Sequence, residues 1–137
     1  MAATRDSATL DNAASALVER LRAALTAALG SGDRAAVAAV RSALAAIGNA
    51  EAVDPAAQRG PADLAMAPSE HFAGAKAGLR AGEVARKRLT AAEVTQIVQA
   101  EITERLSAAA EYDRLGHGSR AERLRREADV LAAALSP

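Results

Sequence analysis

Residues 90–135 read TAAEVTQIVQAEITERLSAAAEYDRLGHGSRAERLRREADVLAAAL, and this stretch does most to predict the fold. Apolar side chains recur in it every three to four residues, which is the spacing of an amphipathic α-helix. A capping box of the form Ser/Thr-x-x-Glu precedes each apolar run, at Thr90–Glu93 and at Ser119–Glu122. In such a box the two side chains satisfy free backbone amides at a helix start. Gly116 separates the runs, so we expect two helices in an antiparallel hairpin.

The first half of the chain repeats this organisation. Residues 11–29 show the same helical spacing and end at Gly30, where we expect the left-handed residue that stops a helix. After a short connector, Asp33 is a good N-cap for a second helix. The apolar stripe of that helix consists of Val37, Val40, Leu44 and Ile47. The pattern predicts a second antiparallel hairpin, preceded by a flexible polar tail over residues 1–10.

The region between the hairpins has a different composition. Residues 54–89 hold many helix breakers, namely Pro55, Gly60, Pro61, Pro68, Gly74, Gly78 and Gly82. A structureless loop of this length is uncommon in a compact domain, so we expect one or two short helical turns within it. The sequence thus predicts an all-α fold, a small bundle of two antiparallel helix hairpins joined by a long, partly irregular Gly/Pro-rich crossover. We expect residues 11–137 to form a single helical domain.

The composition predicts a thin hydrophobic core. The chain has 40 alanines but one Phe, one Tyr and no Trp. Alanine favours helices and lets them approach closely, yet it buries little of the apolar area that stabilises a fold by about 25 cal/mol per Å². Association with other subunits would add burial, so a homo-oligomer is one expectation.

Charge and residue usage limit the classes of partner. The 17 basic and 17 acidic residues balance, which argues against a strong non-specific polyanion binder, and no DNA partner is expected. The chain has no cysteine, which fits a reducing cytoplasm. No run of about 18 apolar residues lacks a charge, so we expect no membrane span. The first 12 residues include acids and no apolar h-region, so we expect no secretory signal.

Several segments resemble the YqeY-like family, which is similar to the tail domain of the B subunit of the tRNA-dependent amidotransferase. Asp33-Arg34, Val40-Arg41 and the stretch LAAIGNAEAV at 44–53 resemble its first helical hairpin. Glu104-Arg105, AAAEYDRLG at 108–116 and AERLRREADVLAAAL at 121–135 resemble its second. The resemblance covers about residues 15–135, the N-terminal helical domain of the GatB/YqeY type only. The turn Gly116-His117-Gly118 departs from the usual Gly-Arg or Gly-Lys.

This resemblance implies a non-catalytic helical binding module that contacts tRNA or a tRNA-handling amidotransferase. We expect the chain to lack the second helical domain that is typical of the family, so the resemblance implies no function that needs that domain. The alternative is a protein–protein adapter or a self-associating helical protein that does not bind RNA. Steep salt dependence of binding would favour RNA, because phosphate contacts release counterions.

Two groups of basic residues are candidates for RNA or partner contact. The first is a local basic excess before the third helix, made by Arg80, Arg86, Lys87 and Arg88. The second comprises Arg120, Arg123 and Arg126, next to Arg125, in the fourth helix. The alternative for the second group is a solvated face, because three acid–arginine pairs stand at the i, i+4 spacing of helix ion pairs. Those pairs are Glu122–Arg126, Arg123–Glu127 and Arg125–Asp129.

Asn49 and Glu51 are candidates for partner contact because of the resemblance alone. The alternative is structural, since Gly48 and Asn49 stand where the second helix should end. We expect no catalytic residue: the serines lack a convincing histidine partner, and no Gly-rich loop follows a strand. His71 and His117 lie far apart in sequence, so we expect no metal site and no cofactor.

Overall fold

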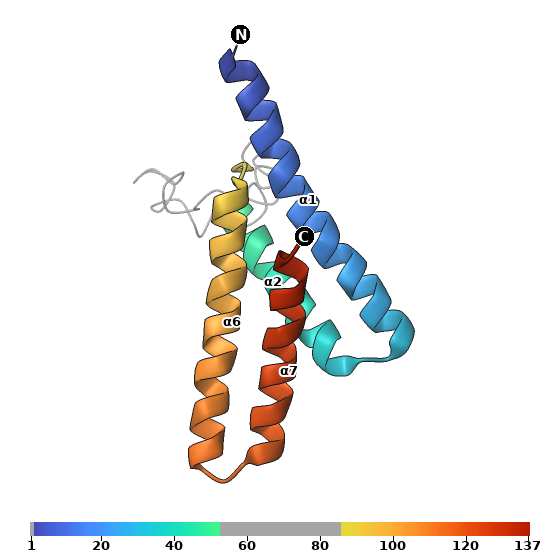
Figure 1. Cartoon of the computed structure of the whole chain (residues 1–137), viewed down its shortest axis with the longest axis vertical. Coiled ribbons are helices and arrows are strands. Elements are labelled where there is room, and N and C mark those ends of the chain that lie inside the picture. Colours follow the sequence, from blue (N-terminus) through green and yellow to red (C-terminus); the bar gives the residue numbers. More distant parts are fainter. Residues whose placement is uncertain (1, 53–85) are drawn as a thin grey trace, which may run out of the picture. The chain divides into compact units, whose positions relative to one another are not determined.

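The computed structural model describes residues 2–52 and 86–137, with side chains from Ala8 onward in the first range. These residues form four α-helices, α1 (Ala2–Ser31), α2 (Arg34–Glu51), α6 (Ala91–Arg114) and α7 (Gly118–Leu135) (Figure 1). The described residues contain no strand, only an isolated antiparallel bridge between Ala52 and Arg86. The predicted all-α fold of two helix hairpins and a connecting crossover is confirmed. Most of the crossover, and the helical turns expected in it, lie outside the described residues.

The chain gathers into two compact units where the sequence predicts one domain over residues 11–137. The first unit consists of Met1–Ile47 and Leu89–Pro137, and it contains α1, most of α2, α6 and α7. The second consists of Gly48–Arg88. In it the two ends of the crossover meet, because the backbone amide of Lys87 donates to the carbonyl of Glu51 over 2.7 Å.

The first helix is longer than its apolar pattern indicates. A flexible tail was expected over residues 1–10, but residues 2–10 are helical, since α1 begins at Ala2. Residues 2–10 contain neither Gly nor Pro. Once a helix is nucleated, each further residue adds a hydrogen bond at little cost, so nothing stops α1 from continuing toward the N-terminus.

The turn between α1 and α2 is closed by Gly32, and the prediction of Gly30 was wrong. Gly32 has a φ of 70°, whereas α1 continues through Gly30. The amide of Asp33 donates to Ala28 and that of Gly32 to Leu29, over 3.0 and 3.3 Å. This pair of bonds is a Schellman motif, which satisfies the last carbonyls of a helix. Asp33 then caps α2 as predicted, since its Oδ1 accepts from the amide of Ala36 over 3.1 Å.

The α6–α7 hairpin confirms one predicted cap and corrects the other. Thr90 caps α6, because its hydroxyl accepts from the amide of Glu93 over 3.1 Å. Gly116 ends the helix at a φ of 80° in a second Schellman motif, as expected. Ser119 is no cap: α7 begins at Gly118, and its N-cap His117 makes no side-chain capping bond. The helix starts two residues earlier than predicted, because the left-handed Gly116 already reverses the chain.

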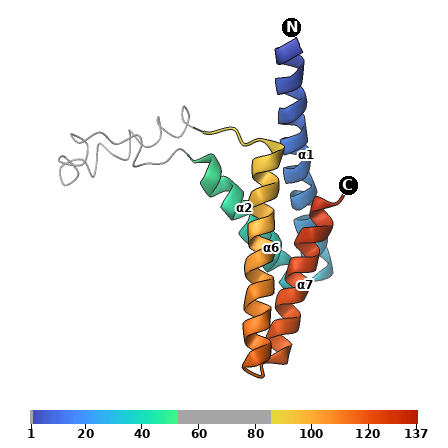
Figure 2. The same cartoon turned by 60° about the vertical axis from the view of Figure 1, so that its left-hand side comes forward.

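The core of the first unit lies between the helices, with α6 and α7 side by side along their length (Figures 1 and 2). Leu21, Val40 and Leu131 are almost completely buried. Among the described residues, nine of the 18 buried apolar side chains are alanines, so the core is thin, as the composition predicts. Two leucines that belong to the apolar patterns of residues 11–29 and 90–135 are exposed, Leu29 at 53% and Leu106 at 47%. They stand at the edges of their stripes, where narrow alanine-rich contacts leave large side chains uncovered.

Candidate functional site

The arginines of α7 are exposed, and each contacts another side chain of the first unit. Arg123 approaches Glu127 at 3.7 Å, which confirms one of the three expected i, i+4 pairs. The other two are wrong, because Arg125 pairs with Asp113 of α6 and Arg126 with Asp33 at the start of α2. Long side chains reach across to neighbouring helices, so sequence spacing alone does not select their partners.

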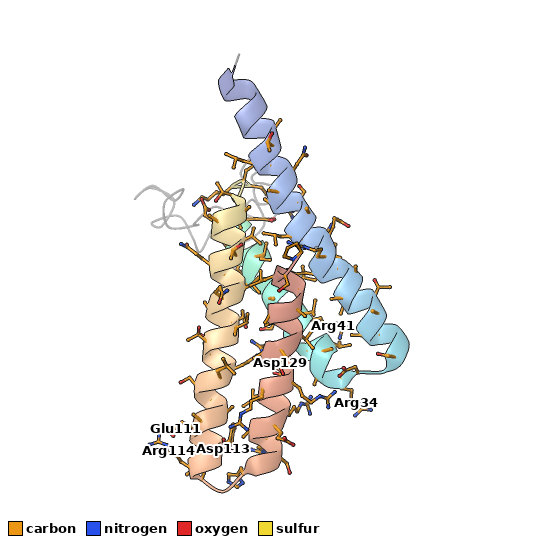
Figure 3. All side chains as sticks on the ribbon, in the orientation of Figure 1. Arg34, Arg41, Glu111, Asp113, Arg114 and Asp129 are labelled. Atoms are coloured by element: carbon orange, nitrogen blue, oxygen red, sulfur yellow. The ribbon has the colours of Figure 1, made fainter. Side chains whose placement is uncertain are left out.

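Arg120, the third arginine predicted as a contact residue in α7, lies at the turn of the α6–α7 hairpin. Its guanidinium stands 5.7 Å from the ring centroid of Tyr112, at cation–π distance. The edge of His117 packs against the same ring, with centroids 6.1 Å apart. Nearby, a hydrogen bond from Arg114 to Glu111 raises the pKa of that arginine above its usual value (Figure 3). Arg120 lies about one helical turn before Arg123, the next arginine of α7.

An open cavity of about 760 Å³ lies where the α1–α2 turn meets the first turns of α7. Its charged and hydroxyl lining comprises Ser31, Asp33, Arg34, Ser119, Glu122, Arg123 and Arg126. We call Arg34, Arg123 and Arg126 the arginine rim. Two of the three were predicted from the sequence, and Arg34 was missed. The available signal was its place next to the N-cap Asp33, which brings it beside the turn.

The arginine rim is held loosely. Arg123 and Arg126 have side chains 57% and 65% exposed, and their nearest carboxylate oxygens lie 3.7 and 3.4 Å away. Exposed pairs of this kind contribute about 0–1 kcal/mol. Arg34 is exposed, extends away from the start of α2 (Figure 3), and pairs with no carboxylate of the described residues. Three cations against two acids, Asp33 and Glu122, leave the cavity lining positive.

A second arginine environment, at the α2–α6–α7 contact, was missed by sequence reasoning. Arg105 of α6 bonds to Glu101 at 2.5 Å and to Glu127 of α7 at 3.1 Å, and Ser42 of α2 donates to Glu101 over 3.0 Å. The three charged side chains are only 10–15% exposed. We call Ser42, Glu101, Arg105 and Glu127 the buried network. Only the i, i+4 spacing of Glu101 and Arg105 signalled it.

A shallow groove of about 600 Å³ follows α1 and the end of α7. Its lining is mostly small and apolar and includes Ala24, Ala27, Val130, Ala133 and Ala134. The lining also includes two charged residues, Arg20 of α1 and Asp33 of the α1–α2 turn. The Nε of Arg20 is buried and has no hydrogen-bond partner. Buried donors without a partner are uncommon in native proteins.

The remaining predicted contact residues belong to the second unit. Arg86, Lys87 and Arg88 are exposed, as is Asn49, whereas Glu51 is half-buried and accepts a backbone bond from Lys87. The structure therefore brings Glu51 next to the basic segment, although the two are predicted separately. Arg80 lies outside the described residues, as does His71.

The described residues hold no group of three or more His, Cys, Asp or Glu that could bind a metal ion. Within the same residues, none of the helices has the length and apolar character needed to cross a membrane. Comparisons of the sequence with protein-family models, with curated proteins and with solved structures found no match.

Proposed function

We propose that the chain is a non-catalytic helical binding module of the GatB/YqeY type, located in the cytoplasm, that contacts the phosphate backbone of tRNA. The alternative for the same surface is the acidic face of a tRNA-handling amidotransferase. The observation that supports the proposal is the arginine rim around an open cavity. Its guanidinium groups are exposed and weakly engaged, which is the condition under which arginines exchange an internal carboxylate for a phosphate.

The energetics favour this exchange. An exposed pair such as Arg126–Asp33 contributes about 0–1 kcal/mol, whereas hydrogen bonds to a charged phosphate contribute about 1.5–3 kcal/mol each. Arginine also matches phosphate with two parallel bonds. Folded RNA is read largely through shape and backbone contacts, so the scarcity of aromatic side chains does not oppose the proposal. Tyr112 is already covered by Arg120.

The test is binding of labelled bulk tRNA to the full chain over a series of salt concentrations. The wild type should bind, and its affinity should fall linearly with salt on logarithmic axes. Replacing Arg34, Arg123 and Arg126 together by Gln should reduce the salt slope by about 2–3, about one for each lost phosphate contact. Arg22→Gln is the matched control, because its side chain is 64% exposed in a surface pair on α1.

A second triple variant combines Arg86→Gln, Lys87→Gln and Arg88→Gln. It tests separately how much the predicted basic segment contributes to tRNA binding. If that variant loses tRNA binding and the rim variant does not, the contact surface is in the second unit. If no form of the chain binds tRNA, the RNA proposal is wrong.

The second candidate function is a protein–protein adapter without RNA binding. It is favoured by four large apolar side chains that are exposed within the described ranges, Leu10, Leu29, Leu106 and Leu115. Leu115 is 68% exposed at the end of the α6–α7 hairpin. Binding of a purified amidotransferase that responds little to salt, and that Leu115→Ser abolishes, would establish this function in place of the first.

A further inference from the structure

The groove along α1 and α7 has a floor of small side chains. On α1, Arg20, Ala24, Ala27 and Ser31 are three or four residues apart and so lie on one face of the helix. Ala27 and Ala133 are exposed. Two exposed alanines, Ala13 and Ala16, continue the same face toward the N-terminus. Small side chains let another helix backbone approach closely, so this face suits a helix better than a bulky ligand.

The groove lining contains two residues of opposite charge, Arg20 of α1 and Asp33 of the α1–α2 turn. Arg20 has a buried Nε that no acceptor of the described residues satisfies. Asp33 uses Oδ1 to cap α2, and its Oδ2 has only the distant Arg126 at 3.5 Å. A carboxylate from outside cannot reach this buried Nε, but it would pair with the rest of the half-buried Arg20 guanidinium, and a guanidinium from outside would pair with Asp33. These two charges define the chemistry of the occupant. It is a helix with a face of small side chains, an acidic residue that meets Arg20 and an arginine that meets Asp33.

The same face of a second copy meets that description. Ala27 lies midway between Arg20 and Asp33 in the chain, and a two-fold axis near it would place each Arg20 opposite the other copy's Asp33. Such an interface is isologous, so one pairing occurs twice. Arg20 and Ser31 are separated by 11 residues of helix, about 17 Å, which is long enough for three helical turns to pack between the two charged residues.

We propose that the chain forms a two-fold dimer in which the α1 faces pack antiparallel along this groove and Arg20 of each copy pairs with Asp33 of the other. The dimer adds burial to a core in which half of the buried apolar residues are alanine. It does not depend on RNA binding, and its test uses no RNA. Failure of tRNA binding would therefore leave the sedimentation result unaffected.

The test is analytical ultracentrifugation of the full chain over a range of concentrations. The wild type should shift from monomer to dimer as concentration rises. Ala27→Glu places two carboxylates against each other at the axis, and it should weaken the dimer at least about tenfold, because like charges across an interface are strongly unfavourable. Ala110→Glu, at an exposed position of α6 outside the groove, is the matched control and should sediment as the wild type. Circular dichroism verifies that each variant is folded.

The charge pairing is tested separately with Arg20→Gln and Asp33→Asn, since Asn also caps helices well and should preserve the start of α2. Each single variant should weaken the dimer, and the double variant should be no weaker than the weaker single variant, because the two residues form one interaction. A wild type that stays monomeric, a dimer that tolerates Ala27→Glu, or additive effects of the two charge variants would each overturn the proposal.

Discussion

Arg105 and Arg126 stand on neighbouring helices of one hairpin, and their surroundings differ in nearly every respect. Arg105 is 12% exposed and bonds to two carboxylates at 2.5 and 3.1 Å. Arg126 is 65% exposed, and its partner Asp33 lies 3.4 Å away. Burial decides what each arginine can do. The first cannot leave its partners without stranding two acids in the core, whereas the second exchanges partners at little cost.

The largest expected effect comes from removing the buried arginine. Arg105→Ala leaves Glu101 and Glu127 without their shared partner, and breaking such a pair costs about 3–5 kcal/mol. Urea denaturation followed by circular dichroism measures this loss of unfolding free energy. Arg22→Ala, in an exposed pair on α1, should change stability by less than about 0.5 kcal/mol. Equal losses in the two variants would remove the distinction between buried and exposed arginines.

A more detailed test replaces the whole network at once. The triple variant Glu101→Met, Arg105→Met and Glu127→Met leaves no stranded charge, and such replacements are often neutral or stabilising. We expect it to be more stable than Arg105→Ala in the same urea measurement, with Ser42 turning to its own helix for a hydrogen bond. If the triple variant is the less stable of the two, the network itself contributes net stability.

Two substitutions of Asp33 separate its effect on protein stability from its effect on tRNA binding. Asp33→Ala removes the cap of α2 and should cost about 1 kcal/mol. Asp33→Ser retains a capping oxygen but not the charge, so stability should be nearly unchanged. Both variants free Arg126 from its carboxylate, and both should therefore bind tRNA more tightly. Thermal melts and tRNA titrations of the same preparations check the two effects, and weaker tRNA binding in Asp33→Ser would count against the arginine rim.

The smallest expected effect is the change in protein stability when the exposed arginines are replaced. Arg123→Gln and Arg126→Gln should each change the free energy of unfolding by less than about 0.5 kcal/mol. Arg105 contacts Oε2 of Glu127, and Arg123 contacts Oε1. A larger loss of unfolding free energy in Arg123→Gln would show that the contact of Arg123 with Oε1 is stronger than its distance of 3.7 Å indicates.

Helix positions and chain reversals could be predicted from the sequence, because periodicity, Thr90, Asp33 and Gly116 act locally. The first turn was misplaced because Gly30 and Gly32 both permit a left-handed residue, and the choice depends on how far α1 stays packed; Ala28 is still buried. Arginine partners were harder to predict. Arg105 and Glu127 are 22 residues apart in sequence, and they meet only because α6 and α7 pack in one particular register. Predicting the groove would also have required knowing how the helices pack against one another.

The length of α1 has a consequence for how the protein opens. The helix spans 30 residues, and Ala14 is its first buried side chain among those described. The turns before Ala14 form a helix too short to persist alone in water. Amide protons there should exchange with deuterium within seconds to minutes, as in a fraying peptide, whereas those around Leu21 should exchange only when the whole bundle unfolds.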